Sequence, residues 1–151
     1  MRRRFVFVLV SFLFTSSPAL AQAPSSGDAA NLQGTWQFVG LEANAGKKPP
    51  EETQGWKVIF EGDQMWIVKP SGTDPKLKFK LDPTKDPKRI DLIVQEGNDK
   101  GRVAPGIYAF TGGQLHLCIN IFGNPSYRPS EFKTQDHDGA GFAILERVKP
   151  K

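Results

Sequence analysis

The sequence predicts an all-β fold, an eight-stranded antiparallel up-and-down β-barrel, and two observations support this prediction. Apolar residues recur at every second position between Gly, Pro and Asp residues, and no stretch keeps a long helical period. Short turns join most of the predicted strands to their sequence neighbours, and closing such a sheet removes its exposed edges. A two-sheet β-sandwich is the alternative that this pattern leaves open.

The individual strands follow from the same alternation. Lys76-Leu77-Lys78-Phe79-Lys80-Leu81 is the clearest, because three lysines alternate with three apolar residues and so place one face in water and the other in a core. Glu61-Gly62-Asp63 and Thr111-Gly112-Gly113 are predicted to be hairpin turns, since glycine tolerates positive φ. The predicted strands span residues 35–41, 56–60, 64–68, 76–81, 90–94, 107–110, 115–119 and 142–148.

Two connections are longer than the others, residues 44–54 and residues 120–141. The second shows no clear periodicity over about twenty residues, which is typical of a functional loop or of an unrecognised element. Within it, residues 130–134 fit a short extra strand. These two connections are therefore the segments in which a functional site is expected.

The N-terminal residues are typical of a secretory signal peptide. Arg2-Arg3-Arg4 is a basic start, residues 5–14 are apolar but too few to span a bilayer as a helix, and Ala19-Leu20-Ala21 fits a cleavage site. We therefore predict an exported protein, periplasmic or extracellular, with no membrane insertion after cleavage. The predicted organisation is a signal peptide over 1–21, a flexible leader over 22–30 and one barrel domain over 31–149.

The charge balance argues against nucleic-acid binding. The chain has 20 basic and 16 acidic side chains, and loss of the three arginines of the signal peptide leaves a nearly neutral mature protein. Cys118 is the only cysteine, so the chain forms no internal disulfide and a buried thiol is expected. The core must then stabilise the fold unaided.

The sequence lacks common catalytic motifs, among them Gly-x-Ser-x-Gly, His-Glu-x-x-His and Cys-x-x-Cys, so we expect no enzyme and no cofactor. A carboxylate-based hydrolase is a distant alternative. His116 and Cys118 share a strand face, but residues two apart lie about 6.6 Å apart along a strand, too far for a catalytic pair. Asp136-His137-Asp138 holds potential metal ligands, yet adjacent loop residues rarely converge, and we expect a polar turn there rather than a metal site.

Six segments of the predicted domain carry a family resemblance: Leu32-Gln33-Gly34-Thr35-Trp36, Phe60-Glu61-Gly62-Asp63, residues 80–92, Gly106-Ile107-Tyr108, Leu115-His116-Leu117-Cys118 and Arg128-Pro129-Ser130-Glu131-Phe132. In this order they resemble the uncharacterised exported lipocalin-like domain family found mainly in planctomycete bacteria. The resemblance covers nearly the whole predicted domain.

The resemblance implies a way of closing the barrel. Gly34 and Trp36 match the Gly-x-Trp start of lipocalin-like barrels, and Arg147 matches the arginine of the last strand. Trp36 is then expected to close one end of the barrel, with the Arg147 guanidinium across its ring in a cation–π contact. In lipocalin-like barrels the first long connection, here residues 44–54, often forms a lid over the open end.

The function favoured by these observations is an exported binding module that holds a small hydrophobic molecule inside the barrel. The alternative is a structural or protein-interaction module of the cell envelope with a filled core. The sequence does not identify a protein partner. The residues expected to line the ligand site are Phe60, Phe79, Tyr108, His116, Cys118, Tyr127, Arg128 and Phe132.

Overall fold

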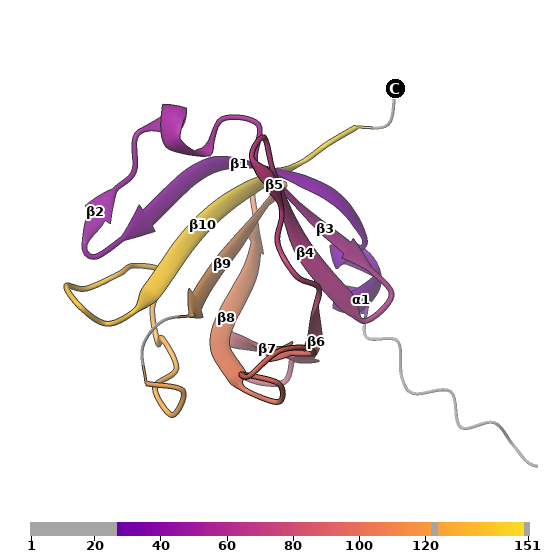
Figure 1. Ribbon diagram of the computed structural model, residues 1–151, viewed down its shortest axis with the longest axis vertical. Coiled ribbons are helices and arrows are strands. Elements are labelled where there is room, and N and C mark those ends of the chain that lie inside the picture. Colours follow the sequence, from indigo (N-terminus) through magenta and orange to yellow (C-terminus); the bar gives the residue numbers. More distant parts are fainter. Residues whose placement is uncertain (1–26, 122–123, 150–151) are drawn as a thin grey trace, which may run out of the picture.

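The computed structural model describes residues 27–121 and 124–149, which form a closed, eight-stranded antiparallel β-barrel of the lipocalin-like kind (Figure 1). Each strand of the wall pairs with its neighbours, and the last strand pairs with the first to close the sheet. In order around the wall, the strands are β1 (Gly34–Ala43), β3 (Lys57–Glu61), β4 (Gln64–Lys69), β6 (Leu77–Asp82), β7 (Lys88–Val94), β8 (Val103–Thr111), β9 (Gln114–Asn120) and β10 (Ala140–Arg147). The smaller elements are the helix α1 (Gly27–Leu32), the short strands β2 (Gly46–Lys47) and β5 (Gly72–Thr73), and the 3-10 helix η1 (Pro50–Thr53).

The eight predicted strands are all present, and the closed sheet excludes the sandwich alternative. Residues 130–134 form no strand, contrary to the prediction, because the strands that flank them in sequence, β9 and β10, are already paired on both sides. The predicted flexible leader is also wrong in part, since residues 27–30 belong to α1. The predicted signal peptide and residues 22–26 lie outside the described residues.

The alternation of side chains along β1 changes phase once. Trp36 and Phe38 contact the core, the register with β10 shifts between Phe38 and Gly40, and Leu41 then contacts the core. Val39 is the extra residue of this β-bulge, and its side chain is 42% exposed. The bulge therefore keeps the apolar side chains at both ends of β1 inside the barrel.

One end of the barrel is closed around Trp36. Its ring is only 2% exposed, and its Nε1 donates a hydrogen bond to the carbonyl oxygen of Leu32 at 2.8 Å. The Arg147 guanidinium lies over the ring, with Cζ 4.3 Å from the ring centroid. Gly34 leaves room for this arginine, because its φ is +111° and a Cβ there would lie 3.0 Å from Arg147 Nη1.

The helix α1 lies at this closed end and is held there by backbone and side-chain hydrogen bonds. Arg147 donates to the carbonyl oxygens of Asn31 and Gln33, the latter at 2.6 Å. The Gln33 side chain bonds both backbone groups of Gly62 in the turn between β3 and β4, at 2.8 and 3.0 Å. Residues 27–33 are therefore part of the closed end.

Asp28 fixes the start of α1 to the opposite wall. Its carboxylate accepts a hydrogen bond from the buried Tyr108 hydroxyl at 2.7 Å and pairs with Lys88 Nζ at 2.8 Å. The hydrogen bond from Lys88 holds the pKa of Asp28 below its usual value, although partial burial opposes this. Burial, and secondarily the hydrogen bond to Asp28, raise the pKa of Tyr108. The hydroxyl therefore stays protonated and donates to the carboxylate.

The long connection between β9 and β10 packs against the outside of the barrel. Arg128 donates to the carbonyl oxygens of Gly106 at 2.7 Å and Ile90 at 3.2 Å, and it pairs with Asp91 at 2.6 Å. Asp91 lies on the outer face, because its neighbours Ile90 and Leu92 point into the core cluster. The expected position of Arg128 at the barrel mouth is therefore wrong, and this side chain binds the loop to the outer wall.

The opposite end of the wall, the open end, is less completely paired. β4 pairs with β6 only through the first two residues of each strand, Gln64 with Lys78 and Met65 with Leu77. Beyond these pairs, β4 pairs instead with the short strand β5. The wall between β4 and β6 is consequently joined at one end and separated at the other.

Candidate functional site

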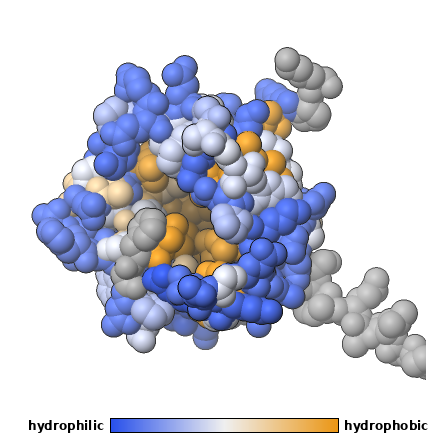
Figure 2. Space-filling view, in the orientation of Figure 1, coloured by the Kyte–Doolittle hydropathy of each residue, from blue (hydrophilic) through white to orange (hydrophobic). Residues whose placement is uncertain are grey.

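A hollow opens on one face of the barrel. Figure 2 shows hydrophobic residues inside the hollow and hydrophilic residues around its edge. In the same orientation, β9 and β10 lie on one side of it and β4 and β6 on the other (Figure 1). Concave apolar surface with a polar edge is the usual form of a small-molecule site.

The apolar side chains at the open end are only partly buried. Alternation along each strand places them on the same inner face as the core residues, and they pack against the core cluster. By contrast, the interior near α1 is filled by fully buried side chains such as Leu32 and Leu145. The partly exposed inward-facing residues at the open end are Phe38, Leu41, Ile67, Leu77 and Ala104.

Trp56 forms one edge of the open end, and the sequence-based site omitted it. Trp56 precedes β3 and, by alternation, lies on the same face as the core residues Val58 and Phe60. Its ring contacts the ring of Phe38 edge-on, with 5.7 Å between the two centroids. Lys69 Nζ lies 4.9 Å from the Trp56 ring centroid and 2.7 Å from a carboxylate oxygen of Asp74. An aromatic ring with a charged pair beside it thus borders the apolar surface. Trp56 could have been recognised from the sequence, because it alternates with Val58 and Phe60 at every second position.

Three of the predicted lining residues lie in the packed core below the hollow. Phe60, Phe79 and Tyr108 are all buried. Phe60 and Phe79 meet edge-on at 5.4 Å between ring centroids, and the Tyr108 hydroxyl is bonded to Asp28. These rings therefore form the floor of the site rather than its exposed lining.

His116, Cys118 and Phe132 lie on the outer side of the wall, so their predicted place inside the barrel is wrong. Leu115 and Leu117 belong to the core cluster, and alternation along β9 directs His116 and Cys118 to the other face. There the His116 ring lies 6.0 Å from the ring of Phe132, measured between centroids. These side chains stabilise the loop on the barrel.

The Cys118 thiol is unsuited to nucleophilic chemistry. It is fully buried in a second apolar cluster with Ile107 and Ala140, and its Sγ donates to the carbonyl oxygen of Lys133 at 3.6 Å. Burial, together with the nearby charge of Asp138, raises the pKa of the thiol to about 11. At neutral pH Cys118 is therefore a protonated core residue.

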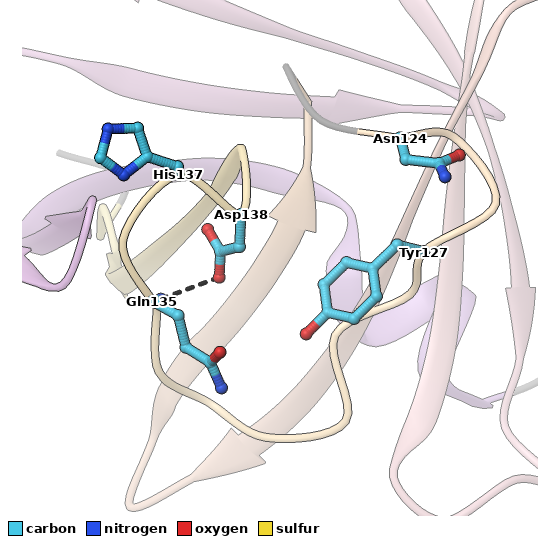
Figure 3. Close-up of a pocket in the computed structure, with 5 residues that line it drawn as sticks. All are labelled: Asn124, Tyr127, Gln135, His137 and Asp138. Carbon is cyan, nitrogen blue, oxygen red and sulfur yellow. Dashed lines mark hydrogen bonds between the residues drawn. The ribbon is translucent and has the colours of Figure 1, made fainter.

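The loop outside the barrel contains a second hollow, here called the loop pocket. It has a volume of about 320 Å³ and is lined by Asn124, Tyr127, Gln135, His137 and Asp138 (Figure 3). Tyr127 is 42% exposed, and in Figure 3 its hydroxyl points toward Gln135 while the His137 ring points away. Of the predicted lining residues, Tyr127 is thus the one with a large exposed surface beside a hollow.

Asp138 serves the turn, as the polar-turn interpretation of Asp136-His137-Asp138 predicts. Its two carboxylate oxygens accept hydrogen bonds from the backbone N–H groups of Gln135 and Ala140, each at 2.8 Å. Within residues 27–121 and 124–149, no three His, Cys, Asp or Glu side chains come together as a metal site. The residues that resemble metal ligands in sequence are separated by the turn that they form.

Comparisons of the chain with protein-family models, with curated proteins and with solved structures found no match. In the part of the chain that the structure describes, no helix has the length and apolar character needed to cross a membrane. The barrel fold and the geometry of its two hollows are accordingly the basis for assigning a function.

Proposed function

We propose that this protein binds a small, predominantly apolar molecule in the hollow at the open end of its barrel. The observation that carries the proposal is the difference between the two ends of the interior. Around Trp36 at the closed end, Leu32 and Leu145 are completely buried, whereas inward-facing apolar side chains such as Leu77 and Ala104 remain partly exposed at the open end. A ligand that covers them removes apolar surface from water, which favours binding.

The size of a suitable ligand follows from the free energy that binding requires. Micromolar affinity corresponds to about 8 kcal/mol, and lost translational and rotational freedom costs at least about 4 kcal/mol more. At about 25 cal/mol per Å², the ligand and the protein together must remove roughly 500 Å² of apolar surface from water. A bicyclic aromatic compound or a medium-length acyl chain meets this requirement.

The edge of the hollow suits a ligand with one polar end. Trp56 offers an aromatic face, and the adjacent ion pair of Lys69 and Asp74 offers a donor and an acceptor. The apolar part of the ligand would then point toward Phe60 and Phe79. The predicted export fits the same role, since the N-terminal sequence and the resemblance to exported lipocalin-like domains both predict a protein outside the cytoplasm.

Filling the hollow tests the proposal. Ala104 faces the interior of β8 opposite Leu92, and Ala104→Phe is expected to weaken binding of the fluorescent apolar probe N-phenyl-1-naphthylamine by about tenfold or more, which corresponds to about 1.4 kcal/mol. The measurement is a fluorescence titration of the purified protein. Ala109→Phe is the matched control, because Ala109 lies on the outer face of the same strand and is also partly exposed. It is expected to bind the probe as the unsubstituted protein does.

Two outcomes would contradict the proposal. One is equal loss of probe binding in both variants, and the other is an unsubstituted protein that does not bind the probe at all. The second outcome would favour the filled-core interaction module. Thermal unfolding of both variants checks that each change leaves the barrel folded.

A further inference from the structure

We propose that the loop pocket is a second binding site, independent of the barrel hollow, and that it takes a neutral saccharide unit. The pocket lies between two turns of the long β9–β10 connection, residues 124–127 and 135–138. Figure 3 shows the side chains of Tyr127, Gln135 and Asp138 gathered between these turns. A volume of about 320 Å³ is at the small end of ligand pockets and suits one or two sugar rings.

The first turn is held rigidly to the barrel. Asn120, at the end of β9, is 1% exposed, and its Nδ2 donates to the carbonyl oxygens of Asn124 at 3.0 Å and Tyr127 at 2.9 Å. The Tyr127 N–H also donates to the Asn124 carbonyl oxygen at 2.9 Å. A buried amide thus fixes both ends of the turn that carries Tyr127, which lowers the entropy cost of binding.

The second turn is held by its own carboxylate. Asp138 accepts hydrogen bonds from the backbone of Gln135 and Ala140, and the turn is anchored to β1 through Thr134, which donates to Glu42 Oε1 from its N–H at 2.8 Å and from its hydroxyl at 3.1 Å. Both sides of the pocket are therefore fixed before a ligand arrives.

The exposed groups match a sugar ring. A pyranose has an apolar face of C–H bonds that stacks on an aromatic ring, and hydroxyl groups at its edge that need both donors and acceptors. Tyr127 presents an exposed ring, and among the described residues neither its hydroxyl nor the Gln135 side-chain amide forms a hydrogen bond. The Tyr127 hydroxyl and the Gln135 amide supply donors and acceptors together.

The local charge selects a neutral ligand. Glu131 pairs with Lys133 at 2.7 Å, and Asp138 is the carboxylate among the residues that line the pocket. An anion such as phosphate would be repelled. A metal cation would need ligands that the turn does not bring together, since both Asp138 oxygens are bonded to backbone N–H groups.

Saturation-transfer NMR of the full chain with glucose, mannose and N-acetylglucosamine tests this proposal, with inorganic phosphate added as an anionic competitor whose binding is detected by loss of the sugar signal. Transfer to at least one of the three sugars is expected, and Tyr127→Ala is expected to weaken that binding by about tenfold. Tyr127→Phe keeps the ring face and is expected to stay within about threefold. Val39→Ala is the surface control, because Val39 is equally exposed on β1.

The proposal is overturned if none of the sugars shows transfer, if Tyr127→Ala binds as the unsubstituted protein does, or if phosphate binds in preference to the sugars. Titration with N-phenyl-1-naphthylamine separates the two sites. Tyr127→Ala is expected to leave binding of this apolar probe unchanged, since Tyr127 lies outside the barrel wall.

Discussion

Replacing Trp36 with alanine is expected to lower the free energy of unfolding by about 3–5 kcal/mol, the cost typical of truncating a buried tryptophan. The change leaves a cavity between the barrel floor and α1, removes the hydrogen bond to the Leu32 carbonyl oxygen, and removes the surface on which Arg147 stacks. Phe110, whose ring centroid lies 6.3 Å from that of Trp36, loses its neighbour as well. Urea unfolding followed by circular dichroism measures the effect.

Trp66→Ala is the matched control for this experiment. Trp66 pairs with Ile59 on the outer face of the sheet, is only partly buried, and is covered by Lys76 Nζ at 4.2 Å from its ring centroid. Its loss is expected to cost about 1 kcal/mol or less, as for an exposed cation–π pair. Similar losses in the two variants would show that the closed end is not the main packing centre of the barrel.

Gly106→Ala, which adds a single methyl group, is expected to lower the free energy of unfolding by about 3 kcal/mol or more, at the upper end of overpacking effects. A Cβ at this position would overlap Ile119 Cδ1 and would lie 2.7 Å from the Cys118 carbonyl oxygen. The second of these atoms belongs to the backbone of β9, so β8 and β9 would have to separate. Arg128, which donates to the Gly106 carbonyl oxygen, would then lose part of its attachment.

Gly141→Ala provides a direct comparison. Gly141 faces the same residue, Ile119, from the other neighbouring strand, but a Cβ there meets no atom within 4 Å. It is expected to change the free energy of unfolding by less than about 1 kcal/mol, and in the stabilising direction, because alanine restricts the unfolded chain more than glycine does. Equal destabilisation by the two substitutions would contradict the close approach of β8 to β9.

The fold was predictable because its signal is local. Period-two alternation and Gly-rich turns identify each strand, as in residues 76–81, and short connections determine which strands are neighbours. α1 was missed because six residues carry no periodic pattern. What holds this helix in place is tertiary, namely Asp28 with Lys88 and Tyr108.

The site was less predictable, for two physical reasons. Burial depends on position along the barrel axis, which alternation does not report, so Phe60 and Phe79 are on the correct face but lie too deep. His116 and Cys118 were instead assigned to the wrong face of the wall, although their alternation with Leu115 and Leu117 already indicates the outer face.

Apart from its polar turn at Asp136-His137-Asp138, the path of the long connection was not predictable. Single side chains from distant strands hold it in place, as when Arg128 reaches Asp91 and Thr134 reaches Glu42. Such contacts leave no periodic signal in the sequence. Tyr127 accordingly lines the loop pocket, whereas the sequence placed it at the mouth of the barrel.

Methyl-resolved NMR during titration with N-phenyl-1-naphthylamine tests most directly whether the open end of the barrel is the binding site. We predict that the methyl signals of Leu77 and Ala104 shift, while those of Leu32 and Leu145 at the packed closed end do not. Shifts confined to Leu32 and Leu145, or shifts on the outer face alone, would contradict the assignment of the hollow as a ligand site.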